Sequence, residues 1–320
     1  MKNRYPRRMV QAALLALAAC TCMEAGAGLL RDRIAERRAQ QQDDELEGTR
    51  PDKATKVPAG TRVVRDVAYG ADPAQRFDVY APAQGGKGAP VIFLVHGGGW
   101  KHGDKAMGRI VENKVARWVP RGFVVVSTNY RMLPGTLPVD QARDVAKALA
   151  TAQAKAAEWG GDRSRFILMG HSAGAHIVSL ITASPTLAAE QGSAPWLGTV
   201  ALDSAAFDVA QIMEGRHMRL YDPAFGTDPA YWRAASPYHV LAKAGVPMLA
   251  VCSSRRDDSC AQARRFAGKA QPLGMRVQVL EENYSHGEIN FKLGEPGAYT
   301  EAVEAFMRQL DPAVASLLRS

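Results

Sequence analysis

One serine of the 320-residue chain lies in a setting that suits a nucleophile. Ser172 stands in the segment GHSAG, residues 170–174, between an apolar run and a segment with helical spacing. A glycine on each side of a serine permits a sharp strand-to-helix turn, which exposes the hydroxyl at the carboxyl edge of a sheet. Small residues at this spacing also permit close packing of a helix against a strand. The segment alone therefore leaves two interpretations open.

A second glycine motif, HGGGW at residues 96–100, directly follows another apolar run. Successive glycines leave backbone N–H groups free to converge on one point, and acyl transfer needs such donors for the oxyanion of its tetrahedral intermediate. A flexible turn or a phosphate loop is the alternative, but neither the lysine–serine pair of a P-loop nor a GxGxxG pattern is present. The motif therefore favours chemistry at a carbonyl group.

A serine hydroxyl is a weak nucleophile until a base, usually a histidine held by a carboxylate, takes its proton. Among the seven histidines, His286 follows the last predicted strand, from which a loop can return to the sheet edge. The others lie in the HGGGW motif and its loop, close to Ser172 in sequence, or in an aromatic-rich insertion. His286 is the predicted base, and a surface loop position is its alternative.

The carboxylate is expected after the penultimate strand, where CSSRRDDSC supplies Asp257 and Asp258. Serine, then acid, then histidine is a known chain order for such triads. The spacing from the small residue Ser254 favours Asp257, whereas proximity to the following helix favours Asp258. The sequence leaves the choice open with a preference for Asp258, and the other aspartate would be solvated or would cap the helix.

Apolar strands alternate with amphipathic helices from about residue 61 onward. Alternating segments at 62–70 and 75–82 predict an antiparallel pair of strands, and later apolar runs predict buried strands. This alternation is typical of an α/β fold with a mostly parallel sheet and helices on both faces. Residues 203–240 break the rhythm and are rich in aromatic and turn-forming residues. They predict an insertion over the active edge, as a lid or a substrate wall.

The N-terminus predicts export. MKNRYPRR is basic and contains no acid, and the apolar run after it is too short to span a bilayer comfortably. The letters LAAC, ending at Cys20, are similar to the lipobox of bacterial lipoproteins, so we expect a signal peptide over 1–19 and lipidation of Cys20. Thr21 in place of aspartate favours the outer membrane, on its periplasmic or cell-surface side. Cleavage near residues 24–28 and secretion as a soluble protein is the alternative.

Residues 20–60 are polar and predict a tether, which leaves residues 61–320 as one catalytic domain. The composition, 47% hydrophobic and 22% charged, is ordinary for a globular protein. Removal of the leader would halve the net charge of +8, and no basic cluster remains, so nucleic-acid binding has little support. No metal-ligand spacing such as HExxH occurs, and we expect neither a metal nor an organic cofactor.

Cys252 and Cys260 bracket the residues SSRRDDS. Exported proteins meet an oxidising compartment, so the pair predicts a disulfide that would stiffen the loop carrying the acid. Two free buried thiols are the alternative.

Four segments together, HGGGW, NYRMLPGTLPVDQARDVAKAL, WGGDRSRFILMGHSAGAHIVSL and SHGEIN, resemble the α/β-hydrolase esterases of the hormone-sensitive-lipase-like and kynurenine-formamidase-like group. The resemblance covers about residues 63–310. It implies Ser172 as nucleophile, His286 as base and structural roles for Asp144 and Asp162. It also implies an oxyanion hole formed by the amides of Gly97, Gly98 and Ala173. Many relatives carry Gly-x-x-Asp-Pro at the acid, where this chain has SSRRDDS.

These observations predict a serine hydrolase that cleaves small carboxylic esters of short to medium acyl length through an acyl-enzyme. An arylformamidase or amidase using the same groups is the alternative within enzymes. A surface-anchored binding module without turnover is the alternative outside them. The expected partners are the ester substrate and a membrane, which the chain would reach through its lipid anchor.

Overall fold

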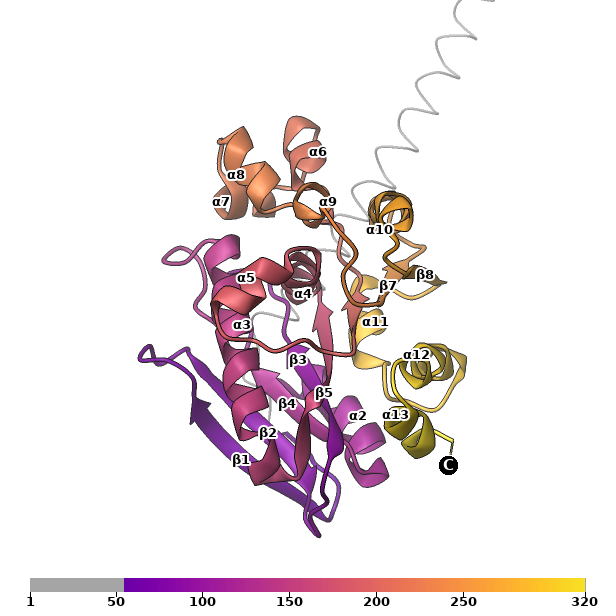
Figure 1. The fold of residues 1–320 in the computed structure, drawn as a ribbon. Coiled ribbons are helices and arrows are strands. Elements are labelled where there is room, and N and C mark those ends of the chain that lie inside the picture. Colours follow the sequence, from indigo (N-terminus) through magenta and orange to yellow (C-terminus); the bar gives the residue numbers. More distant parts are fainter. Residues whose placement is uncertain (1–54, 320) are drawn as a thin grey trace, which may run out of the picture. The chain divides into compact units, whose positions relative to one another are not determined.

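An eight-stranded sheet organises residues 55–319, the part of the chain that the computed structural model describes (Figure 1). The strand order is β1-β2-β4-β3-β5-β6-β7-β8. The strands are β1 (Thr61–Ala68), β2 (Arg76–Pro82), β3 (Ala89–Val95), β4 (Val124–Thr128), β5 (Gly161–His171), β6 (Gly198–Leu202), β7 (Met248–Ser253) and β8 (Val277–Glu282). Within this sheet β2 runs antiparallel to both neighbours, and every other pair is parallel. The predicted mostly parallel sheet is confirmed.

The central strands are buried on both faces, which explains their continuous apolar sequences. In β3, Val91, Phe93 and Val95 pack into one hydrophobic cluster, whereas Ile92 and Leu94 pack into the cluster on the opposite face. Each of these side chains is at most 2% exposed. The sheet is therefore the middle of three layers.

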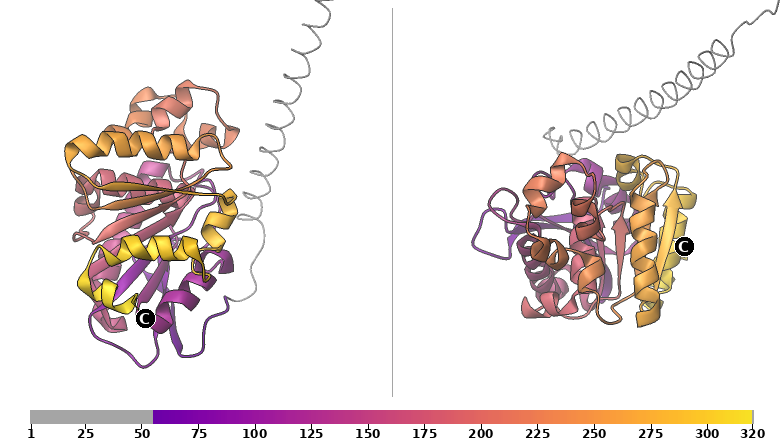
Figure 2. Two further views of the ribbon diagram at one scale, coloured as in Figure 1. Left: turned by 90° about the vertical axis from the view of Figure 1, so that its right-hand side faces the viewer. Right: turned by 90° about the horizontal axis from the view of Figure 1, so that it is seen from above.

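Helices cover both faces of the sheet (Figure 2). One face carries α3 (Pro138–Lys155), α4 (Ala173–Ala183), α5 (Pro185–Glu190) and α10 (Ser259–Ala270). The other carries α2 (Gly108–Trp118), α12 (Ala298–Arg308) and α13 (Pro312–Leu317). Among the helices of residues 55–319, none combines the length and the apolar character that crossing a bilayer requires.

The predicted insertion includes the 3-10 helix η3 (Arg219–Tyr221) and four short α-helices beyond the carboxyl ends of the strands. In Figure 1 these α-helices lie above α4. They are α6 (Val209–Glu214), α7 (Asp222–Phe225), α8 (Pro229–Ala234) and α9 (Pro237–Val240). Residues 203–240 are called the cap below.

The predicted signal peptide, the predicted lipidation site Cys20 and most of the predicted tether lie outside the described residues. The last six residues assigned to the tether, 55–60, are described and make contacts with the domain. The hydroxyl of Thr55 donates to the carbonyl of Ala106 at 2.5 Å, and the amide of Lys56 donates to the carboxylate of Glu112 at 2.7 Å.

The two glycines of GHSAG allow α4 to approach the sheet closely. A Cβ atom added to Gly174 would lie 2.3 Å from the carbonyl oxygen of Val95, and one added to Gly170 would lie 2.4 Å from that of Gly174. Real Cβ contacts are not this short, and backbone atoms cannot rotate away as a side chain can. The close-packing interpretation of these glycines therefore holds, and it does not exclude the turn described below.

We predict that Gly174→Ala lowers the free energy of unfolding by about 3 kcal/mol, because the added methyl group must push α4 away from β3. The matched control is Gly268→Ala in α10, where an added Cβ meets no atom within 4 Å. That control should raise stability by up to about 1 kcal/mol, since alanine favours a helix over glycine. Urea unfolding of both variants measures the difference, and equal midpoints would contradict the prediction.

Candidate active site

Ser172 is the single residue between the end of β5 and the start of α4. Its φ of 55° and ψ of −119° are rare for a residue with a side chain, so the turn is strained. Two backbone bonds hold it: the amide of Ser172 donates to Leu202 at 2.9 Å, and His176 donates to the carbonyl of Ser172 at 3.0 Å. Ser172 is partly exposed, whereas His171 and Ala173 on either side are buried. This is the geometry of a nucleophile elbow.

His286 is the first residue of the helix α11 (His286–Phe291), where the sequence had predicted a loop. The helix begins with a capping box, in which Ser285 and Glu288 bond each other's backbone amides. The imidazole is 3% exposed and lies 4.5 Å from the ring of His171, centroid to centroid. The Nε2–H of His171 also donates to the carbonyl of His286 at 2.9 Å. Because His171 directly precedes Ser172, these contacts bring His286 to the elbow.

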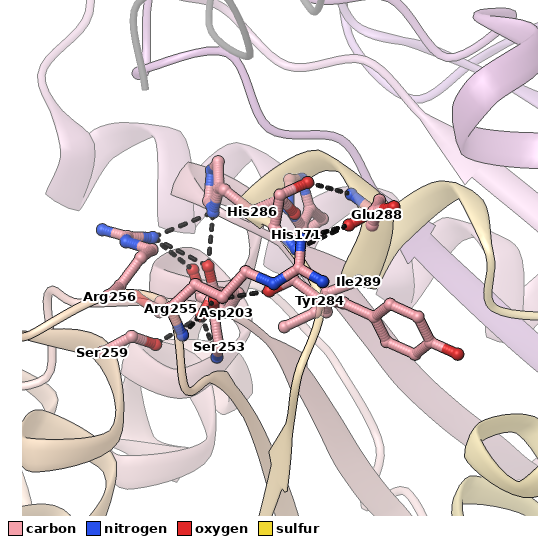
Figure 3. Close-up of polar contacts among 12 residues, drawn as sticks. His171, Asp203, Ser253, Arg255, Arg256, Ser259, Tyr284, His286, Glu288 and Ile289 are labelled. Carbon is pink, nitrogen blue, oxygen red and sulfur yellow. Dashed lines mark hydrogen bonds and ion pairs between the residues drawn. The ribbon is translucent and has the colours of Figure 1, made fainter. Parts of the chain in front are cut away.

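The carboxylate that binds His286 belongs to Asp203. Its Oδ2 lies 2.6 Å from Nδ1 of His286, and the carboxylate is fully buried (Figure 3). Asp203 directly follows β6 and has a φ of 54°. The expectation of Asp257 or Asp258 is therefore corrected. Both are exposed, and Asp258 forms an ion pair with Arg256 at 3.3 Å instead.

Besides His286, three residues of the segment 253–259 donate hydrogen bonds to Asp203. Its Oδ1 accepts from the amide of Ser253 at 2.7 Å and from the hydroxyl of Ser259, and its Oδ2 accepts from Nη1 of Arg256 at 2.8 Å. Burial alone would raise the pKa of Asp203. The charge of Arg256 and the hydrogen bonds from His286 and Ser259 outweigh burial and hold that pKa well below its usual range. The group is therefore an anion at any pH near neutrality.

The predicted disulfide between Cys252 and Cys260 is present. It closes the turn between β7 and α10, and both of its cysteines are buried. The sequence predicted that this turn would carry the acid. It carries instead the donors to the acid, Arg256 and Ser259.

The proposed oxyanion donors lie where the HGGGW loop meets the start of α4. Gly98 has a φ of 106°, and a Cβ there would lie 2.3 Å from the carbonyl of His102, so this position requires glycine. Among the hydrogen bonds found in residues 55–319, none is donated by the amides of Gly97, Gly98 or Ala173. The close contact of Gly174 with Val95 brings the two segments together.

The two aspartates that the resemblance treats as structural lie in ordinary supporting contacts. Asp144 is buried in α3 and accepts two hydrogen bonds, of 2.8 and 2.7 Å, from the guanidinium of Arg131, which follows β4. Asp162 accepts from the amide of Ser164 at 2.8 Å, near the start of β5.

A neutral histidine of α4, the helix that follows the turn at Ser172, links this helix to the cap. Nδ1 of His176 accepts from the indole of Trp100 at 3.1 Å, so its proton is on Nε2, which donates to the carbonyl of Ala235 at 2.8 Å. Complete burial lowers the pKa of His176 to about 4. The rings of Tyr221 and Phe225 in the cap pack on Trp100, with centroids 5.8 and 5.0 Å away.

Comparison with known proteins agrees with this architecture. The BD-FAE family model matches residues 77–258, more than half of the chain. The chain belongs to the BD-FAE family. This family is part of the α/β-hydrolases, as the sequence resemblance implied.

Relatives of this BD-FAE protein carry esterase names. It is 30% identical over 267 residues to "Esterase LipC" of Mycobacterium tuberculosis, across 77% of this chain and 65% of that protein. It is 36% identical over 118 residues to "Probable isoprenylcysteine alpha-carbonyl methylesterase ICME" of Oryza sativa subsp. japonica, across 37% of this chain and 28% of that protein. The chain thus spans less than two thirds of either relative.

Solved structures share the fold of this BD-FAE protein at low identity. Esterase B of Lactobacillus rhamnosis (HN001) superposes with a TM-score of 0.68 at 19% identity, over 92% of this chain and 97% of the other. The apo form of Thermogutta terrifontis esterase 2 gives a TM-score of 0.64 at 23% identity, over 81% and 96%. The α/β-hydrolase fold predicted from the sequence is confirmed.

Two residues of this candidate site were not predicted from the sequence, Asp203 and Arg256. A usable signal existed for Asp203, because an acid that ends the apolar run GTVAL stands at the same sheet edge as Ser172. No comparable signal marks Arg256, which lies among four charged residues in RRDD.

Proposed function

We propose that this BD-FAE protein is a serine hydrolase of carboxylic esters, with Ser172, His286 and Asp203 as its triad. The observation that carries the proposal is the 2.6 Å contact of Asp203 with Nδ1 of His286, beside the strained elbow at Ser172. The esterase names of the relatives support the reaction class. The triad and the acyl-enzyme are the finer part of the proposal.

The reaction begins when the hydroxyl of Ser172 attacks the ester carbonyl and Nε2 of His286 takes its proton. Asp203 accepts the Nδ1–H bond, which fixes the tautomer and stabilises the imidazolium that forms. The amides of Gly97, Gly98 and Ala173 bind the oxyanion. His286 then protonates the leaving alcohol, and water repeats the sequence on the acyl-enzyme. No step requires a metal or an organic cofactor.

Aromatic residues in and beside the cap favour a substrate with a short to medium acyl group. Trp100, Tyr221 and Phe225 are each at most 5% exposed and pack on one another beside the HGGGW loop. We expect this aromatic cluster, next to the loop of the proposed oxyanion donors, to limit the acyl chain to short or medium length.

We predict that the purified protein hydrolyses p-nitrophenyl esters from acetate upward, with kcat/KM falling before decanoate. Ser172→Ala should lower kcat by about 10⁴-fold or more, because the residual rate rests on the oxyanion donors and binding alone. A fluorophosphonate should label the wild type and not the variant. A folded wild type that neither turns over esters nor takes the label would contradict the proposal. Turnover of aryl formamides alone would favour the amidase alternative.

We predict that Asp203→Asn lowers kcat by about 10³- to 10⁴-fold, because an amide cannot hold the Nδ1–H tautomer of His286. Asp258→Asn and Asp257→Asn are the matched controls, since both change an exposed aspartate of the neighbouring loop. Asp257→Asn should keep kcat within about threefold of the wild type, as expected for a surface charge. Asp258→Asn should lose far less than Asp203→Asn, because its half-exposed carboxylate pairs with Arg256. A loss in Asp258→Asn as large as that in Asp203→Asn would contradict the assignment.

We also propose that the protein is exported and lipid-anchored through Cys20 to the outer membrane. The LAAC pattern supports this proposal, and a disulfide between Cys252 and Cys260 suits an oxidising compartment. In a Gram-negative host, labelled palmitate should enter the wild type and Cys22→Ser but not Cys20→Ser. A wild type that stays unlabelled and soluble would overturn the proposal.

A further inference from the structure

Arg256 lies in the catalytic centre rather than on the surface of its loop. Its side chain is 12% exposed, and Nη1 lies 2.8 Å from Oδ2 of Asp203 and 2.9 Å from Nδ1 of His286 (Figure 3). Its other terminal nitrogen, Nη2, faces Oδ1 of Asp258 at 3.3 Å. The guanidinium, the carboxylate and the imidazole thus meet at one point.

One proton decides how this cluster is bonded. A guanidinium can only donate, and Nδ1 of an imidazole either carries a proton or offers a lone pair. An ionised carboxylate 2.6 Å from Nδ1 requires the proton between them, so Nδ1 donates to Asp203. Nη1 of Arg256 then donates to Asp203 and not to His286. Its positive charge stands beside the imidazole without a bond to it.

His286 therefore shares its counter-ion, Asp203, with Arg256. Ionisable groups that face it include His171 from β5, Asp203 after β6 and Arg256 after β7. Asp258, the second carboxylate that pairs with Arg256, is 46% exposed, so solvent screens its charge. On α11 itself, Glu288 is paired with Arg255 at 3.2 Å. When His286 takes the proton of the nucleophile, two cations face one buried carboxylate. Like charges at this distance oppose protonation of the base.

The loop that carries Arg256 is fixed at both ends. The Cys252–Cys260 bond closes it, the amide of Ser253 at its start and the hydroxyl of Ser259 at its end both bind Asp203, and Arg256 binds from between them. The position of the guanidinium is thus determined by the same contacts that hold the carboxylate.

We propose that Arg256 is a positioning residue of the triad that holds Asp203 against His286 and, through its charge, keeps His286 neutral to a lower pH. The inference rests on the proposed serine hydrolase mechanism. Its consequence is an enzyme that remains active in mildly acidic medium.

The test compares Arg256→Met, which removes the charge, with Arg256→Lys, which keeps it. Arg264→Met is the matched control, because Arg264 is 59% exposed on α10 and loses the same charge. The acid limb of the kcat/KM profile for p-nitrophenyl acetate should move up by about 1 pH unit in Arg256→Met. It should stay in place in the other two. Plateau kcat/KM should fall roughly 10- to 100-fold in Arg256→Met, as expected for a misplaced catalytic group.

A second readout does not require turnover. NMR titration of the His286 imidazole, assigned with His286→Asn, should show the same upward shift in Arg256→Met. An inactive wild type would defeat the proposed function, whereas this titration would still decide the role of Arg256. An unchanged or lowered midpoint in a variant with wild-type unfolding overturns the inference. If the methionine variant does not fold, Arg256→Gln gives the same reading.

Discussion

A fully buried carboxylate organises the catalytic end of this protein. Asp203 has no access to solvent, and an ion in such a place costs several kcal/mol unless hydrogen bonds and opposite charge compensate it. Four groups supply that compensation: the amide of Ser253, the hydroxyl of Ser259, the guanidinium of Arg256 and the imidazole of His286. They come from the end of β7, the start of α10, the loop between them and the start of α11. The folded position of each element is therefore linked to one charge.

The parallel sheet makes this convergence possible. His171 at the end of β5 is in register with Leu202 at the end of β6, and the amide of Asp203 donates to Val251 of β7 at 2.8 Å. Neighbouring strands thus end at one edge, where each delivers a different functional group. An acid after β6 stands one strand nearer to the nucleophile than an acid after β7 would. After β7 the chain places the cation Arg256 instead, so the centre is a cluster of Arg256, Asp203 and His286 and not a simple Asp–His pair.

The sequence predicted those features that depend on local pattern. Apolar runs predicted the buried strands, and small residues around Ser172 predicted a turn that the structure shows with a positive φ. The acid was missed because the choice between Asp203 and the aspartates of RRDDS depends on which side chains point inward, a property of the folded loop. The start of α11 was readable, since Ser285 and Glu288 form a capping-box spacing. The four cap helices are too short for helical periodicity to reveal them.

The tie between His176 and the cap has a consequence for how this protein can diverge. In the cap, the acceptor is the backbone carbonyl of Ala235 and not a side chain. The indole of Trp100 donates to Nδ1 of His176, so the imidazole proton stays on Nε2 and points at that carbonyl. Every amino acid has that carbonyl. Apart from Asp203, the cap can therefore exchange its side chains, and with them the shape of the substrate site, while its attachment to α4 persists. Substrate range and catalytic geometry can drift separately during evolution.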